Sequence, residues 1–166
     1  MLRLVEEAGQ SLRPNPDAPV IGLEDFAEFI QTSRSLMHFH ATSAGKSWEE
    51  AMEMNFPLMG TLAGMGALRV VGARVRGDLV GYSVFYLTLD FVKVRLVAPI
   101  IFLFALPEWP LLGLRLVRAT IREAKALGAS QVWISQTRES GFSWRMDILA
   151  KRVRMKLLSI TYSVEM

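Results

Sequence analysis

The sequence predicts a single domain of the mixed α/β class, with antiparallel N-terminal strands followed by a parallel strand-helix-strand crossover. A chain of 166 residues with 51% hydrophobic content fits one compact core and leaves no room for a second. The spacing of apolar residues changes from helical to strand-like near residue 68. A strand, a helix and another strand then follow one another through short links, which implies a parallel pair joined by a right-handed crossover.

The N-terminal part is expected to hold an irregular segment and two helices. Three prolines and the lack of periodicity make residues 1–22 an irregular N-terminal segment. Apolar residues at helical spacing, with acidic residues in the first turns, predict a helix over residues 24–36. Ser47 and Glu50 match a capping box, so a second helix should begin there and end at or shortly after Pro57.

Three strands are expected next. Residues 68–76 and 79–89 are rich in Val, Tyr, Phe and Leu, and Gly77 between them suits the tight turn of a hairpin. Residues 93–106 form an apolar run that is typical of a strand buried on both faces, and Pro107 ends it.

The clearest helix in the sequence covers residues 112–127, where apolar residues step by three and four. Gly128 follows at the position where a helix commonly ends. A short strand over residues 131–135, a helix over 142–153 and a final strand over 157–164 complete the expected order.

Composition excludes several classes of protein. The chain has no cysteine, so disulfides, thiolate metal sites and a cysteine nucleophile are excluded. The mean hydropathy is +0.27, but the most apolar run, residues 97–106, is about half the roughly 20 residues that a membrane-spanning helix needs. Acidic residues interrupt the apolar start of the chain, which gives no support for export. We therefore expect a cytoplasmic protein that does not cross a membrane.

Charge is distributed unevenly along the chain. Four basic and nine acidic residues precede Arg69, a net charge of −5, whereas fifteen basic and seven acidic residues from Arg69 onward give +8. Arg115, Arg118, Arg122 and Lys125 are spaced so that they share one helix face. Such a face suits an anionic partner, either a phosphorylated cofactor or a nucleic acid. The sequence leaves open which of these binds and whether the face is simply solvated.

The junction between the third strand and the long helix is the most informative about chemistry. The strand ends in Pro107-Glu108-Trp109, a short loop follows, and the helix opens at Gly113. The first N–H groups of a helix have no partner within it, and the helix dipole favours anions there. A glycine without Cβ lets a phosphate approach this backbone closely, so the junction predicts an anion-binding loop.

This junction resembles motif A of the GNAT acyltransferase superfamily. The resemblance rests on Pro107-Glu108-Trp109, on Gly113, on residues 114–118 and on residues 125–129, and it covers roughly residue 68 to the C-terminus. It is especially similar to phage-encoded members, which carry Pro-Glu-Tyr at the strand end and Gly-Leu-Arg-Leu-Ile-Arg in the helix.

The pyrophosphate loop departs from the family pattern. The family signature has Gln or Arg, two residues, Gly, one residue, and then Gly or Ala, and these positions hold Pro110, Gly113 and Arg115 in this chain. The resemblance therefore points to a GNAT-like mixed sheet whose acyl-CoA site lies at the strand-helix-strand crossover and whose pyrophosphate loop is degenerate.

The resemblance implies transfer of an acetyl or related acyl group from acyl-CoA to an amine, and the acceptor is not identified. The implied cofactor-binding residues are Leu103, Phe104, Ala105, Leu111, Leu112, Gly113, Leu114, Arg115 and Arg118. Glu108 is the candidate general base, because it is the carboxylate nearest the strand end. Ser135 and Tyr162 are substitutes for the tyrosine acid that the family carries in its last helix.

Other sites are weaker candidates. Residues 43–47 resemble the end of a phosphate-binding P-loop, but no strand precedes them. His38 and His40 form a His-x-His pair without a third ligand at a recognisable spacing, so a packed or solvated helix end is favoured over a metal site. One alternative function stays open, a non-catalytic GNAT-like phage structural or nucleic-acid-binding protein. A homodimer is possible with either function.

Overall fold

The computed structural model describes residues 18–134, except 44, 48 and 50–54, together with residues 151–153. Four helices and six strands lie in these ranges. In chain order they are β1 (Val20–Glu24), α1 (Phe26–Thr32), α2 (Arg34–Ser43), α4 (Phe56–Gly64), β2 (Leu68–Val75), β3 (Asp78–Tyr86), β4 (Thr88–Asp90), β5 (Arg95–Ala105), α5 (Leu112–Ala126) and β6 (Gln131–Ile134).

The strands form one mixed sheet. β1, β2, β3 and β5 are neighbours in that order and pair as antiparallel strands, and β4 pairs antiparallel with the start of β5. β6 pairs with β5 in parallel, from Val97↔Gln131 to Ile100↔Ile134. The predicted α/β class, the antiparallel N-terminal strands and the parallel crossover are therefore confirmed.

The last part of β5 has one strand beside it in the described ranges. Ile100 has Phe85 of β3 on one side and Ile134 of β6 on the other, whereas the residues that follow pair with β3 alone. Val84 pairs with Phe102 and Phe85 with Ile100, so Ile101 is the extra residue of a β-bulge. Ile101 is also exposed, so the prediction that this strand is buried on both faces is wrong at that position.

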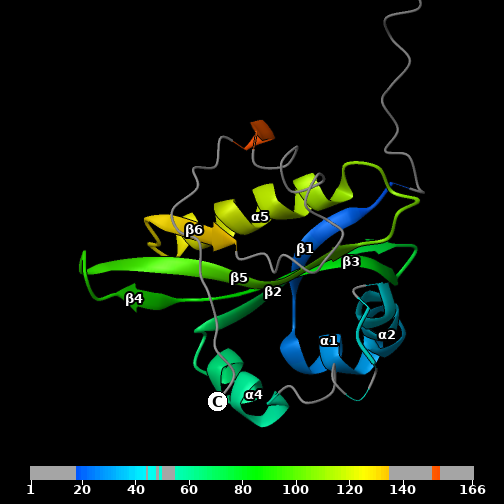
Figure 1. Ribbon diagram of the computed structural model, residues 1–166, viewed down its shortest axis with the longest axis horizontal. Helices are drawn as coiled ribbons and strands as arrows, with labels where there is room; N and C mark the ends of the chain where they lie inside the picture. Colours follow the sequence, from blue (N-terminus) through cyan, green and yellow to red (C-terminus); the bar gives the residue numbers. More distant parts are fainter. Residues whose placement is uncertain (1–17, 44, 48, 50–54, 135–150, 154–166) are drawn as a thin grey trace, which may run out of the picture.

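Helices cover both faces of the sheet (Figure 1). α5 lies on one face, where Val71, Phe85 and Ile100 pack with Leu116 and Val117. The other face is covered by α1, α2 and α4 and carries a second core, built on Phe29, Leu36, Val70, Tyr82, Val84 and Phe104. The alternation of strand side chains between two cores is why β2 and β3 read as nearly continuous apolar runs.

Two N-terminal expectations are corrected by the structure. Residues 20–22 belong to β1 and not to an irregular segment, and β1 pairs along its whole length with β2. The predicted helix over 24–36 is two helices, α1 and α2, separated at Ser33. Ser33 serves both: its N–H donates to the Phe29 carbonyl, and its own carbonyl accepts from the N–H of Met37.

The expected end of the second helix is also wrong. Pro57 lies in the first turn of α4, and Asn55 caps that helix by accepting from the N–H of Leu58. Proline suits the first turn because the N–H that it lacks would have no partner there. Most of the helix predicted from Ser47 onward lies outside the described residues.

The hairpin and the long helix agree with expectation. Arg76 and Gly77 both have positive φ, 51° and 93°, which makes the β2–β3 turn the two-residue type that favours glycine. α5 ends at the predicted position, and Gly128, with φ of 88°, follows it. None of the helices in the described ranges is long and apolar enough to cross a membrane.

Candidate active site

The chain turns sharply between β5 and α5. The N–H of Trp109 donates to the Leu106 carbonyl, and the N–H of Leu112 donates to the Trp109 carbonyl. Leu111, the residue before the helix, has a φ of 67°, which a residue with a Cβ adopts at a cost. These bonds and this strained residue hold the first turn of α5 at the end of β5.

The first turn of α5 contains two backbone N–H groups that have no acceptor among the described residues. Leu112 and Arg115 donate to carbonyls of the loop, whereas the described residues provide no acceptor for the N–H groups of Gly113 and Leu114. A Cβ placed on Gly113 would meet no atom within 4 Å. Packing therefore does not require this glycine, and the space that a side chain at this position would occupy is open among the described residues.

Gly81, on the neighbouring strand β3, is the glycine that packing requires. A Cβ there would lie 3.0 Å from the Phe104 carbonyl oxygen, 3.1 Å from Leu116 Cδ1 and 3.2 Å from Ala105 Cα. The absence of a side chain at Gly81 lets α5 and the end of β5 approach β3 closely.

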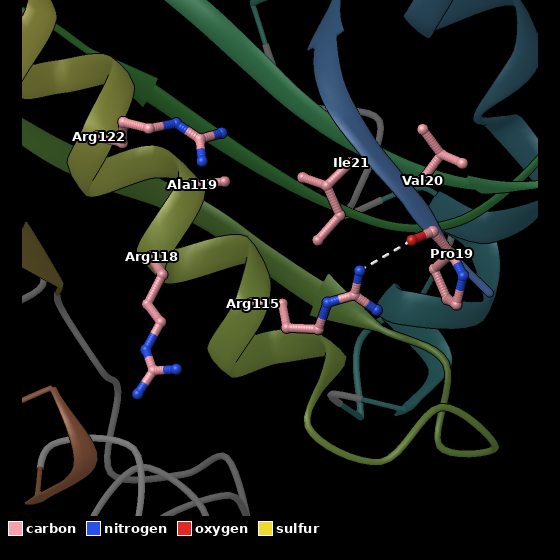
Figure 2. Close-up of a pocket in the computed structure, with 7 residues that line it drawn as sticks. All are labelled: Pro19, Val20, Ile21, Arg115, Arg118, Ala119 and Arg122. Atoms are coloured by element: carbon pink, nitrogen blue, oxygen red, sulfur yellow. Dashed lines mark hydrogen bonds between the residues drawn. The ribbon is translucent and has the colours of Figure 1, made fainter. Parts of the chain in front are cut away.

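A basic groove runs between α5 and the start of β1 (Figure 2). It has a volume of about 350 Å³ and is lined by Pro19, Val20, Ile21, Arg115, Arg118, Ala119 and Arg122. Arg115 points across it and donates to the Pro19 carbonyl oxygen at 2.9 Å. None of the described residues that line the groove is acidic, so its three guanidinium groups make it attractive to anions.

The predicted cofactor-binding residues fall into several environments. Leu112 is fully buried in the core beneath α5, and Leu103, Ala105 and Leu114 pack against that core. Phe104 points into the opposite core, and Leu111 is exposed. Gly113 lies at the open first turn of α5, and Arg115 and Arg118 line the basic groove.

A second cluster lies on the opposite face of the end of β5. His40 of α2 and Tyr82 of β3 are joined by a hydrogen bond of 2.7 Å between Nδ1 and the phenol oxygen. The His40 ring stacks on Phe104 with ring centres 4.5 Å apart and planes at 22°. Phe39 packs edge-on against the same phenylalanine.

Burial keeps this cluster uncharged. Burial and, to a smaller extent, the charge of Lys46 lower the pKa of His40 to about 4, so its imidazole is neutral at pH 7. Burial raises the pKa of Tyr82 far above its ordinary value, so the phenol keeps its proton.

The sequence indicates His40 only as half of a possible metal pair and gives no reason to single out Tyr82. These residues are 42 positions apart, and no spacing rule connects them. The sequence favoured a packed or solvated helix end over a metal site for the two histidines. In the structure His40 is packed, whereas His38 is exposed.

Neither a protein-family model nor a curated protein matches this sequence. Solved structures do match. Ribosomal-protein-alanine N-acetyltransferase from Brucella melitensis biovar Abortus 2308 is 18% identical, with a TM-score of 0.68, over 90% of this chain and 99% of that one. Aminoglycoside acetyltransferase HMB0005 from an uncultured soil metagenomic sample is 12% identical, with a TM-score of 0.72, over 90% and 99%.

A third similar structure is AAC(6')-Iy in complex with the bisubstrate analogue CoA-S-monomethyl-acetylneamine. It is 14% identical, with a TM-score of 0.67, over 89% of this chain and 99% of that one. All three proteins are acetyltransferases, and each shares the fold of this chain at a TM-score of 0.67 to 0.72. The chain has the GNAT fold.

Within the GNAT fold, the candidate catalytic groups lie in different places. Glu108 is exposed on the loop between β5 and α5. Ser135 and Tyr162 lie outside the described residues, as do most of the predicted helix over 142–153 and all of the strand over 157–164. All three catalytic assignments stay predictions.

Proposed function

We propose that this protein is an acyl-CoA-dependent N-acyltransferase that moves an acetyl or related acyl group to an amine. Its GNAT fold and the acetyltransferases that share it support this proposal. The similar proteins act on different amines, from ribosomal-protein alanine to aminoglycosides, so the fold does not select the acceptor. The phage-type assignment and the cytoplasmic location stay predictions from the sequence.

The first turn of α5 carries the proposal. The N–H groups of Gly113 and Leu114 have no acceptor in the described part of the chain, and the space beside Gly113 is open. Two aligned N–H groups at the positive end of a 15-residue helix would hold a pyrophosphate. The residues present therefore fit acyl-CoA, which would supply the thioester that the amine attacks.

Because the loop departs from the family pattern, backbone groups would make the contacts to the pyrophosphate. Pro110 has no N–H to donate, and the Arg115 side chain points to Pro19. The phosphate contacts would thus come from Gly113 and Leu114, with Arg118 as a nearby positive charge. The edge of β5 after Ile100, beside which the described residues place no strand on the β6 side, would take the extended arm of the cofactor.

Titration calorimetry with acetyl-CoA tests this assignment. Gly113→Glu should abolish binding, because the new side chain fills the space beside the N–H groups and repels a pyrophosphate. Gly113→Gln is the matched control, with the same bulk and no charge, and should weaken binding less. Wild-type protein at 100 times the dissociation constant of acetyl-CoA should gain about 2.7 kcal/mol of stability.

Both variants should stay folded, since a Cβ at Gly113 meets no neighbour. Equal acetyl-CoA affinity in wild type and Gly113→Glu would remove the loop from the site. If wild-type protein shows neither heat of binding nor thermal stabilisation with acetyl-CoA, the proposed function is wrong.

The basic groove favours a second candidate function, nucleic-acid binding by a non-catalytic GNAT-like protein. Three of the four residues predicted to share a helix face, Arg115, Arg118 and Arg122, line it together. If this face binds duplex DNA, each phosphate neutralised should contribute roughly −0.9 to the slope of log affinity against log salt.

Changing Arg122 and Lys125 to glutamine separates the two functions, because both residues lie beyond the first turns of α5. Under the acyltransferase proposal, acetyl-CoA affinity should barely change, and DNA binding should be weak at low salt and absent at physiological salt. Submicromolar, salt-steep DNA binding that this double variant loses, together with no acetyl-CoA affinity, would favour the second candidate.

A further inference from the structure

His40 and Tyr82 form an uncharged polar pair inside an aromatic cluster. Tyr82 is 2% exposed, and its hydroxyl meets His40 Nδ1 at 2.7 Å. Phe29 packs edge-on against Tyr82, and Phe104 stacks on His40. Burial of an imidazole and a phenol among apolar rings is costly unless they bond to each other, so this geometry is firmly held.

The second ring nitrogen of His40 is available to a ligand. Nε2 has no hydrogen-bond partner in the described part of the chain, and it is not fully buried. Solvent can therefore reach it. The pair thus has a closed side, where Nδ1 meets Tyr82, and an open side at Nε2.

The open nitrogen lies beside the strand end that the proposed function uses. His40 stacks on Phe104, whose backbone is next to Ala105, the last residue of β5. Phe104 is also the cross-strand partner of Tyr82. α2 and β3 therefore bring an imidazole to the end of β5 on the face opposite α5.

We propose that His40 is the base that takes the proton from the acceptor amine, and that Tyr82 is the positioning residue that fixes its ring. This inference rests on the proposed function. Bound acyl-CoA supplies a thioester carbonyl, where a C–N bond to the amine forms and the C–S bond breaks to release the thiolate. The proton of the attacking nitrogen passes to His40 Nε2 and from there to solvent.

This assignment requires one tautomer. Nδ1 must carry the hydrogen and donate it to the Tyr82 oxygen, which leaves the lone pair on Nε2 and requires an acceptor other than His40 for the phenol O–H. Two titratable groups act on His40 in the described residues, Tyr82 through this bond and Lys46 through its charge. A pKa of about 4 keeps the imidazole free of protons at pH 7.

The low basicity of His40 also restricts the step. An imidazole with a low pKa does not deprotonate a free ammonium ion efficiently, but an amine nitrogen becomes strongly acidic once it bonds to carbon. His40 therefore acts while the C–N bond forms, on an amine that reaches the cluster uncharged.

Nitrogen NMR of the free protein provides the first test, and it needs neither cofactor nor acceptor. We expect His40 to carry its hydrogen on Nδ1 and to titrate near pH 4, and we expect Tyr82→Phe to change both properties. A hydrogen on Nε2 would overturn the inference and leave the proposed function untouched.

Turnover provides the second test, read as thiol release from acetyl-CoA with n-butylamine, an alanine-initiated peptide and an aminoglycoside as probe amines. His40→Ala should lower turnover on the order of 100-fold with little change in acetyl-CoA affinity. Added imidazole should restore part of that rate, because it can enter the space that the side chain leaves. His38→Ala, on the exposed side of the same helix, is the control and should keep wild-type turnover.

Glu108→Ala separates His40 from the base expected from the sequence. If Glu108 is the base, Glu108→Ala loses turnover, His40→Ala does not, and the inference falls. A loss in His40→Ala that imidazole does not restore would assign His40 a structural role and also overturn it. Acetyl-CoA binding without turnover of any probe amine counts against the inference alone, whereas no acetyl-CoA binding at all removes the proposed function and the inference together.

Discussion

The two faces of the sheet differ at the end of β5. On the α5 face, the strand leads to the N–H groups of Gly113 and Leu114, which have no acceptor among the described residues, and to a groove lined by three arginines. On the α2 face, the same strand end meets His40 and Tyr82, which burial keeps uncharged. One face attracts anions, and the other favours neutral groups.

The alternation of side chains along β5 makes this difference possible. Leu103 and Ala105 pack towards α5, whereas Phe102 and Phe104 pack towards the helices on the other face. Successive residues of a strand point to opposite faces, so neighbouring side chains of β5 contact two environments of different polarity. The proposed acyltransferase function would use both surroundings near one strand end.

The largest expected effect concerns the neutral face and acid. The unfolded chain protonates His40 below about pH 6.5, whereas the folded protein does so only below about pH 4. Between these values the unfolded state binds more protons, so the free energy of unfolding should fall by about 2–4 kcal/mol as the pH drops from 6.5 to 4. Urea unfolding at several pH values measures this.

His40→Gln is the comparison, since glutamine does not titrate. The stability of this variant should fall less over the same pH range, by the amount that His40 contributes. Parallel curves for the two proteins would mean that His40 titrates normally, and the α2 face would then not be a neutral site.

An intermediate effect contrasts the two glycines near the end of β5. Gly81→Ala should destabilise the protein by about 1–3 kcal/mol, because the new Cβ meets backbone and Leu116 at 3.0–3.2 Å. Gly113→Ala should be neutral or stabilising by up to about 1 kcal/mol, because it adds a helix former where there is open space. Chemical denaturation measures both, and a large cost at Gly113 would mean that packing requires that glycine.

The smallest effect is expected on the charged face. Arg122→Gln with Lys125→Gln should change stability by no more than about 0.5 kcal/mol, because both side chains are exposed and the ion pair of Arg122 with Glu123 spans 3.6 Å at the surface. Thermal unfolding at low and high salt checks this. A substantial loss would make these residues structural and leave less reason to assign them to an anionic partner.

Local patterns in the sequence determined much of the framework. The glycine at Gly77 predicts the hairpin turn, and the helical period with Gly128 after it predicts α5, because both signals act over a few neighbouring residues. The strand-helix-strand order predicts the parallel β5–β6 pair, because two strands joined by short links to one helix pair in parallel through a right-handed crossover. Gly113 was singled out from sequence for the same local reason.

Other features depend on residues that are distant in the chain. β1 has five residues, and most of its side chains are exposed, so only its pairing with β2 makes it a strand. The break between α1 and α2 falls at Ser33 without a glycine or proline to mark it, in a place where the fold buries that serine.

The His40–Tyr82 pair is the clearest case of a feature that only the tertiary structure decided. Nothing near His40 in the sequence indicates a phenol partner, and nothing near Tyr82 indicates an imidazole. The packing of α2 on β3 brings them within 2.7 Å, and the same burial lowers the pKa of one and raises that of the other. A sequence specifies which groups can exchange protons, but their contact and burial decide which of them will.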